Sequence, residues 1–103
     1  MEKFWKSISA VEAKEIIKQK SHDGDFCILD VRTEKEFLGG AIPGAINLDF
    51  YASDFSQELN KLDKNKTYLI YCRSGSRSKS ALAIMKQLVF EFVYELDGGI
   101  ISL

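Results

Sequence analysis

Hydrophobic residues along this chain fall into two kinds of pattern that follow each other in turn. Short runs in which nearly every position is apolar predict strands at residues 7–8, 26–31, 45–48, 67–71 and 92–96. Continuous apolar runs of this kind are typical of parallel strands that are covered on both faces. The runs at 26–31 and 67–71 therefore indicate central strands of a sheet.

Between these runs, apolar residues recur every three or four positions, which is the spacing of one face of a helix. We expect helices from Ser9 to about Ser21, from Thr33 to Leu38, between Asp54 and Leu62, and after the loop that follows Cys72, through Leu88. The first two begin with capping boxes, in which Ser9 pairs with Glu12 and Thr33 pairs with Glu36.

Strands that alternate with helices favour right-handed crossovers and a parallel sheet. We therefore predict a single domain over residues 1–103, a three-layer α/β fold with a central parallel sheet flanked by helices on both faces. The composition agrees, because 103 residues with 46% hydrophobic content suffice for one core. In such sheets ligands bind outside the carboxyl ends of the strands, where Asp30 and Cys72 both fall.

Charge and composition narrow the range of partners and compartments. The net charge of −1 argues against nucleic acid as a partner. No apolar run approaches the ~20 residues that span a membrane, and the start at residues 1–6 lacks the apolar core of a signal peptide. We therefore expect a cytoplasmic protein that binds neither nucleic acid nor membrane. Two cysteines do not form a disulfide framework, metal-ligand spacing is absent, and no metal is predicted.

The candidate chemistry is concentrated in one loop between the strand at 67–71 and the helix that follows. Its sequence is Cys72-Arg73-Ser74-Gly75-Ser76-Arg77-Ser78. At such a position the loop's N–H groups and the positive end of the helix dipole converge on the cysteine sulfur, and both stabilise a thiolate. Arg73 and Arg77 add positive charge, which lowers the pKa of a cysteine further. We predict a nucleophilic thiolate in a cradle that attracts an anion.

This loop resembles the active-site loop of the rhodanese family, the thiosulfate-type sulfurtransferases. Further segments occur in the order and spacing of a single rhodanese domain: Leu29-Asp30-Val31-Arg32, Glu36-Phe37, Gly40-Ala41-Ile42-Pro43-Gly44-Ala45-Ile46-Asn47 and Leu96-Asp97-Gly98-Gly99-Ile100. The resemblance covers roughly residues 7 to 101. It implies a rhodanese-like fold and a sulfurtransferase activity that needs no cofactor.

By this resemblance, Cys72 is the catalytic residue. It would take the outer sulfur of thiosulfate or a similar anion, hold it as a persulfide and pass it to cyanide or a thiol. Loop length supports this choice, because four residues separate Cys72 from Arg77, whereas cysteine phosphatases with this fold or a similar loop have five. The shorter loop suits a single sulfur atom better than a phosphate group.

The remaining residues of the loop are expected to bind substrate, namely Arg73, Ser74, Gly75, Ser76, Arg77 and Ser78. Gly75 would adopt a positive φ and turn its N–H inward, while Ser76 or a neighbour would also cap the helix. Arginines on a surface loop are often merely solvated, but the helix start favours an anion-binding role for Arg77. Asp30 is expected to orient one of the loop arginines, and the resemblance implies that Arg32 ties down the neighbouring loop.

Two other reactive residues are expected to play no part. Cys27 should be buried and structural, ~10 Å from the edge at which Cys72 emerges, which is too far for a disulfide. His22, the only histidine, falls in the loop after the first helix, at the opposite end of the sheet. The thiolate therefore has no histidine to serve as a general base.

The sequence departs from the family pattern at Ala41, where histidine is usual, at Val89, where glycine is usual, and after Ile100, where a further helix is usual. We expect Ile100, Ile101 and Leu103 either to mediate self-association or protein binding, or to be covered by Phe4 and Trp5. Two alternative functions remain: a non-catalytic rhodanese-like binding module, and a cysteine-dependent phosphatase or arsenate reductase.

Overall fold

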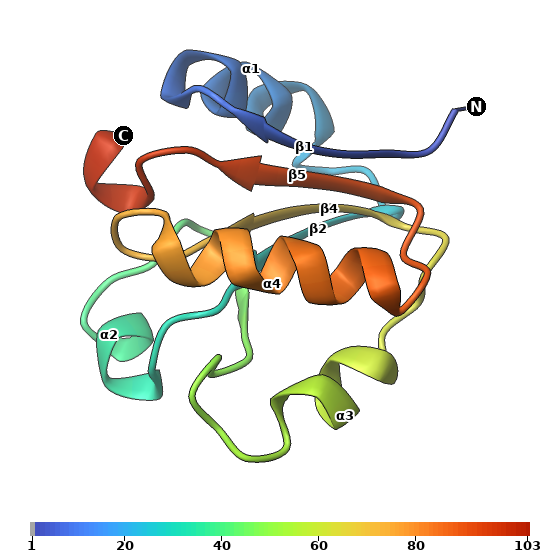
Figure 1. The fold of residues 1–103 in the computed structure, drawn as a ribbon. Helices are drawn as coiled ribbons and strands as arrows, with labels where there is room; N and C mark the ends of the chain where they lie inside the picture. The colour runs from blue at the N-terminus through green and yellow to red at the C-terminus, as the bar shows by residue number, and fades with distance from the viewer. Residues whose placement is uncertain (1) are drawn as a thin grey trace.

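The computed structural model describes residues 2–103 and contains one sheet of five strands (Figure 1). The strands are β1 (Phe4–Ile8), β2 (Phe26–Asp30), β3 (Ile46–Asn47), β4 (Thr67–Tyr71) and β5 (Phe92–Leu96). Their order across the sheet is β1-β5-β4-β2-β3, which puts β4 in the middle. Every adjacent pair is parallel, as the alternation of strands and helices predicted.

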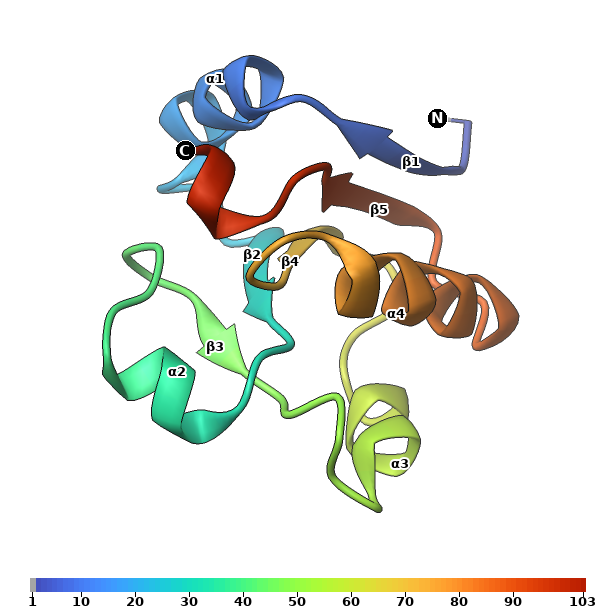
Figure 2. The same cartoon turned by 60° about the vertical axis from the view of Figure 1, so that its left-hand side comes forward.

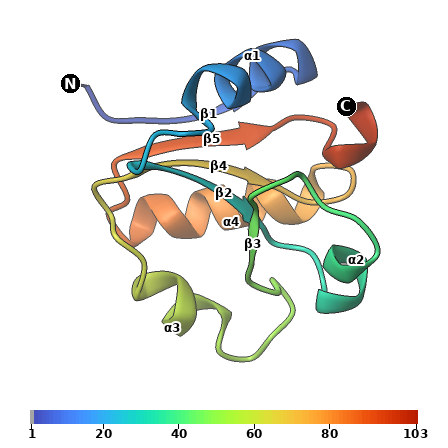
Figure 3. The ribbon, with the colours of Figure 1, turned by 180° about the vertical axis from the view of Figure 1, so that it is seen from behind.

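Helices cover both faces of this sheet. The helices are α1 (Ala10–Lys20), α2 (Glu34–Leu38), α3 (Phe55–Asn60) and α4 (Ser76–Gln87), followed by a 3₁₀ turn, η1 (Ile100–Ser102). Helix α1 lies on one face, α3 and α4 lie on the other, and α2 lies near the carboxyl ends of the strands (Figures 1 and 3). The predicted three-layer α/β domain is confirmed. Within residues 2–103 no helix is long and apolar enough to cross a membrane.

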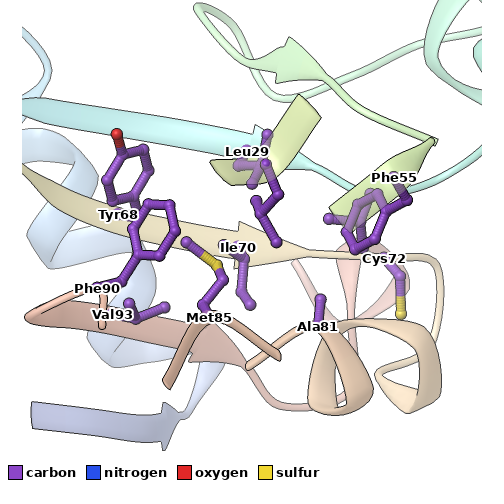
Figure 4. Close-up of a cluster of buried hydrophobic side chains, with 11 residues drawn as sticks. Leu29, Phe55, Tyr68, Ile70, Cys72, Ala81, Met85, Phe90 and Val93 are labelled. Atoms are coloured by element: carbon purple, nitrogen blue, oxygen red, sulfur yellow. The ribbon is translucent and has the colours of Figure 1, made fainter. Parts of the chain in front are cut away.

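Alternate residues of β4 supply two hydrophobic cores, because successive side chains of a strand point to opposite faces. Tyr68 and Ile70 join Cys72 in the core under α3 and α4 (Figure 4), whereas Leu69 and Tyr71 face the core under α1. All five residues are nearly or fully buried. The run at 67–71 is continuously apolar in sequence because both faces of β4 are covered.

Two strand predictions differ from the structure in their limits. Strand β1 is longer than the predicted 7–8, and β3 is shorter than the predicted 45–48. β1 lies at the edge of the sheet and pairs only with β5, and its residues Lys6 and Ser7 are exposed. An exposed edge strand carries polar residues that hide its apolar pattern.

Three expectations about helix starts can be compared with the structure. The capping boxes of Ser9 with Glu12 and of Thr33 with Glu36 are both confirmed. The expectation that Ser76 or a neighbour caps α4 holds only in part, because the neighbouring Gly75 occupies the cap position, without a side-chain hydrogen bond, and Ser76 is the first helical residue. Gly75 has a φ of 112°, so the loop turns sharply into the helix and leaves no place for a serine cap there.

The hydrophobic residues near the last turn are covered only in part. Ile100 is half-buried against the core under α1, whereas Ile101 is 61% exposed and Leu103 is 39% exposed. Phe4 and Trp5 do not cover them, because they begin β1 at the opposite edge, where Trp5 Nε1 donates to the carbonyl of Phe90 at 2.7 Å. That alternative is wrong, and association through this end stays a prediction.

Helix α4 ends in a Schellman motif although it lacks the usual glycine. The N–H of Phe90 donates to the carbonyl of Met85 at 3.0 Å, and the N–H of Val89 donates to the carbonyl of Lys86 at 3.2 Å. Val89 therefore adopts the left-handed conformation, with a φ of 61°, and its side chain is 68% exposed. This conformation is costly for a β-branched residue, because its Cβ crowds the following carbonyl oxygen.

We expect Val89→Gly to stabilise the fold by about 0.5–1 kcal/mol. Removing Cβ relieves about 1–2 kcal/mol of strain, part of which is offset by the greater freedom of glycine in the unfolded chain. Urea unfolding would measure the difference. Val89→Ala is the matched control, because it keeps Cβ and should gain less; a glycine variant no more stable than wild type would contradict the strain argument.

Candidate active site

Cys72 and Asp30 lie at the same edge of the sheet, as predicted. Cys72 follows β4 directly, and Asp30 ends β2 beside Tyr71, the last residue of β4. The side chain of Cys72 lies between the core under α4 and the first turn of that helix (Figure 4). His22 lies in the turn between α1 and β2, at the amino-terminal edge, and does not approach this site.

Backbone N–H groups converge on the sulfur of Cys72. The N–H of Gly75 donates to Cys72 Sγ at 3.0 Å, and the N–H groups of Ser74 and Ser78 help to lower the pKa of the same thiol. Burial raises the pKa of the Cys72 thiol, but the hydrogen bonds from the Ser78 side chain and from the N–H groups of Ser78, Gly75 and Ser74 outweigh burial and leave the pKa below its ordinary value. The loop therefore favours the thiolate.

The last segment of the chain supports this loop from behind. The N–H of Ile100 donates to the carbonyl of Cys72 at 2.9 Å, and the N–H of Ile101 donates to that of Arg73 at 3.2 Å. Gly99 makes the approach possible, since a Cβ there would lie 2.2 Å from the Arg73 carbonyl oxygen. Figure 2 shows η1 beside the loop that precedes α4. The Gly98-Gly99 pair, noted in the sequence only as part of a family pattern, thus fixes the cysteine loop.

Arg77 forms a bidentate ion pair that the sequence did not indicate. Its Nη1 and Nη2 donate to Glu36 Oε1 and Oε2 of α2 at 2.7 and 3.0 Å, and its guanidinium lies 5.4 Å from the ring centroid of Tyr51. Electrostatic coupling to Cys72 contributes to a raised pKa of Arg77, after the larger effect of Glu36. Arg77 therefore interacts electrostatically with Cys72, but Glu36 neutralises part of its charge.

The other predicted loop residues differ in their burial and in their contacts. Ser78 is fully buried, whereas Arg73, Ser74 and Ser76 are exposed. The guanidinium of Arg73 makes no hydrogen bond or ion pair with any residue that the structure describes. Arg73 therefore carries an exposed charge at the edge of the loop.

Asp30 and Arg32 form a buried ion pair with each other. Arg32 Nε lies 3.0 Å from both carboxylate oxygens of Asp30, and Arg32 Nη2 lies 2.7 Å from Asp30 Oδ2. Arg32 Nη2 also donates to the carbonyl of Gly40 at 2.7 Å, so Arg32 holds the loop after α2. The expectation that Asp30 orients a loop arginine is wrong. Arg32 is only two positions from Asp30 along the chain, and it occupies both carboxylate oxygens.

Sequence reasoning missed Glu95, a charged residue that is wholly buried in β5. Its Oε2 accepts a hydrogen bond from Ser78 Oγ at 2.5 Å, its Oε1 accepts one from Ser7 Oγ at 2.5 Å, and Lys79 Nζ lies 3.3 Å from Oε1. Ser78 Oγ in turn lies 3.4 Å from Cys72 Sγ. The available signal was an acidic residue within an otherwise apolar strand.

Cys27 is half-buried and free, so the expectation of a buried residue holds only in part. It pairs across the sheet with Tyr68, four residues before Cys72, and burial raises the pKa of its thiol. Within residues 2–103 no group of three or more His, Cys, Asp or Glu side chains is arranged to hold a metal ion.

Comparison with known families and relatives agrees with this geometry. The family model of the rhodanese-like domain matches residues 9–102. A sulfurtransferase of Allochromatium vinosum is 30% identical over 92% of this chain and 87% of its own length. A thiosulfate sulfurtransferase, GlpE of Coxiella burnetii, is 33% identical over 93% of this chain and 84% of its own length.

Other relatives are longer proteins with a different name. A tRNA uridine(34) hydroxylase of Cytophaga hutchinsonii is 36% identical over 89% of this chain, which covers only 30% of that protein. Among solved structures, a rhodanese-related protein of Thermoplasma volcanium has a TM-score of 0.77 and 30% identity, with 93% of this chain and 87% of that chain covered.

The ion pair of Glu36 with Arg77 should make stability depend on pH. Hydrogen bonds from Arg77 lower the pKa of Glu36 from 4.5 to about 2. A pKa lowered by folding contributes stability above the unfolded value of 4.5, and this contribution is lost as the pH falls to about 2. Glu36→Gln keeps the capping box and should cost about 1–2 kcal/mol at pH 7, since partial exposure screens the pair.

Urea unfolding of wild type and Glu36→Gln between pH 7 and pH 2 tests this expectation. The difference in unfolding free energy should shrink below pH 4.5 and vanish near pH 2. Glu34→Gln, an exposed change on the same helix, is the control and should show a much smaller difference at every pH. A difference for Glu36→Gln that is independent of pH would contradict the role of the ion pair.

Proposed function

The chain belongs to the rhodanese-like domain family, and from that premise we propose that it is a sulfurtransferase that moves a sulfur atom from thiosulfate or a similar anion to cyanide or a thiol. The observation that carries this proposal is the contact of the Gly75 N–H with Cys72 Sγ at 3.0 Å, within a loop that lowers the pKa of the thiol. Such a thiolate is a nucleophile without a neighbouring histidine.

In the first half of the reaction, the Cys72 thiolate attacks the outer sulfur of thiosulfate. A bond forms between the two sulfur atoms, the bond between the outer sulfur and the SO₃ group breaks, and sulfite leaves with the electron pair. Cys72 then carries a persulfide whose terminal sulfur is an anion. The same N–H donors that stabilise the thiolate suit this anion, because fixed backbone dipoles need no rearrangement.

In the second half, the acceptor attacks the terminal sulfur of the persulfide. With cyanide the product is thiocyanate; with a thiol it is a persulfide of the acceptor. The bond between Cys72 Sγ and the terminal sulfur breaks. Cys72 Sγ keeps the electron pair and is again a thiolate. The cycle is redox-neutral, so the proposed reaction requires no cofactor.

The confined position of the sulfur favours transfer of a single atom. Cys72 is only 1% exposed, and four residues separate it from Arg77. The end of a thiosulfate ion presents one sulfur atom to this loop, whereas a phosphate ester would have to place a larger group within it. This argues against the phosphatase and arsenate reductase alternatives. A binding module without activity has no need of a cysteine that receives several N–H groups.

The name of the tRNA uridine(34) hydroxylases does not transfer to this chain. The matched part is 30% of the relative from Cytophaga hutchinsonii, so the activity of that protein need not reside in the part that this chain resembles. The thiolate loop supports sulfur transfer directly, and it is the feature on which the proposal depends.

Intact mass after treatment with thiosulfate tests the proposal. Wild type should gain the mass of one sulfur atom and lose it again on addition of cyanide, whereas Cys72→Ser should gain none and form no thiocyanate. Cys27→Ser is the matched control and should behave as wild type. Failure of the wild type to gain sulfur, or turnover of an aryl phosphate at a comparable rate, would reject the proposed chemistry.

Arg73 should contribute to attraction of the donor anion. Its charge has no partner among the described residues, so we expect Arg73→Ala to raise the KM for thiosulfate about two- to fivefold with a smaller change in kcat. Arg77→Ala should raise the KM as well, because it leaves the Glu36 carboxylate without its partner.

Steady-state kinetics at several salt concentrations distinguish this role from a structural one. The KM of wild type should rise with ionic strength, and the rise should be smaller in Arg73→Ala. Lys86→Ala removes an equal charge from the far end of α4 and should leave the KM unchanged. A KM that is unchanged in both arginine variants would show that the loop arginines are merely solvated.

A further inference from the structure

Glu95 is a wholly buried carboxylate for which the proposed reaction has no use. It lies on β5, which has a neighbouring strand on each side, and its carboxylate contacts only polar side chains among the hydrogen bonds and ion pairs of the described residues. Ser7 and Ser78 donate hydrogen bonds to its two oxygens, and Lys79 lies 3.3 Å from Oε1. A buried charge is expensive unless it is paired, and an apolar residue would fill a strand at lower cost.

One of these contacts connects Glu95 to the reactive sulfur. Ser78 Oγ lies 2.5 Å from Glu95 Oε2, 3.1 Å from the carbonyl of Gly75 and 3.4 Å from Cys72 Sγ. A serine hydroxyl has a single proton and can give it to one acceptor at a time. The carboxylate is the closest acceptor and forms a charge-assisted hydrogen bond, so it competes with the sulfur for this proton.

We propose that Glu95 is a positioning residue for Cys72 that acts through Ser78: it competes with the sulfur for the serine proton, weakens the hydrogen bond from Ser78 to the sulfur and so keeps the thiolate a strong nucleophile. Without this competitor, the hydroxyl of Ser78 would donate fully to the sulfur and would stabilise the thiolate further than it does now. A thiolate that is stabilised too far forms readily but attacks poorly, because nucleophilicity falls as the basicity of the sulfur falls.

The positive charges near Glu95 and Cys72 stabilise the thiolate. Lys79 contacts both Glu95 and Asp97, and Arg77 is paired with Glu36 of α2; Arg73 stands exposed in the loop. All three cations favour the thiolate. Glu95 is linked to Cys72 through the buried side chain of Ser78, and its negative charge opposes the stabilisation of the thiolate by these cations.

The inference rests on Cys72 being the nucleophile of the proposed function, but its test does not require a sulfur donor. The thiolate can be followed by its ultraviolet absorbance as the pH is raised, with Cys72→Ser as the blank, and its reactivity by alkylation with iodoacetamide. All proteins carry Cys27→Ala so that one thiol remains. A protein that transfers no sulfur can still show the shift, which separates failure of this inference from failure of the proposed function.

Glu95→Gln keeps the shape of the side chain and removes its charge. We expect the midpoint of thiolate formation to fall by about one pH unit, because Ser78 is released to the sulfur and a nearby negative charge is lost. The alkylation rate at the high-pH plateau should fall about threefold, as the Brønsted slope of 0.4–0.5 for thiolates requires for a shift of that size.

Two further variants keep the test decisive. Asp97→Asn removes a carboxylate that contacts the same lysine but not Ser78, and should leave the midpoint within a few tenths of a unit. Ser7→Ala, at an exposed position that touches Glu95 but not the loop, should raise the midpoint, because Glu95 then draws more strongly on Ser78.

A midpoint that is unchanged or raised in Glu95→Gln would overturn the inference, as would an equal fall in Asp97→Asn. If Glu95→Gln does not fold, an unchanged midpoint in Ser7→Ala would overturn it instead. A purely structural role for Glu95 would lower the unfolding temperature of its variants without moving the midpoint in opposite directions.

Discussion

Backbone N–H groups that point at one sulfur atom are the constraint on which the rest of the site depends. Such groups cannot be placed by side-chain choice, and the path of the chain must bring them there. Gly75 provides the necessary turn with a φ of 112°, and α4 begins at the next residue. The carbonyls of the same loop are then satisfied from behind by the N–H groups of Ile100 and Ile101. The donor cradle and the turn that supports it are therefore one structural unit.

Charges near this unit are paired according to their burial. Asp30 and Arg32 are buried and satisfy each other, Arg77 and Glu36 are partly buried and form a bidentate pair, and Arg73 is exposed and free of such contacts within the described residues. Buried charges require partners because desolvation is costly, whereas an exposed charge retains its hydration and its field. The structure thus separates the charges that hold the loops from the exposed charge of Arg73.

Sequence reasoning predicted the parts of this molecule that depend on local spacing. The continuous runs of β2 and β4 and the capping boxes of Ser9 and Thr33 involve residues that are close along the chain, and all were identified. Contacts between distant residues were missed: Arg77 with Glu36, and Ser78 with Glu95. The spacing of apolar residues does not indicate which side chains of α2 and β5 will contact the first turn of α4. The loop itself was found because strand, cysteine and helix are consecutive in sequence.

Whether a residue with a positive φ can carry a side chain depends on the space around it. At Gly99 a Cβ would collide with the backbone of Arg73. At Gly75, where φ is 112°, a Cβ would be strained by the backbone conformation and would lie 3.3 Å from the N–H nitrogen of Gly98. Val89 also has a positive φ, of 61°, but its side chain is exposed at the far end of α4. Its strain costs stability alone, because the Schellman hydrogen bonds keep the path of the backbone. A departure from glycine is therefore tolerable at the end of α4 and would be destructive beside Cys72.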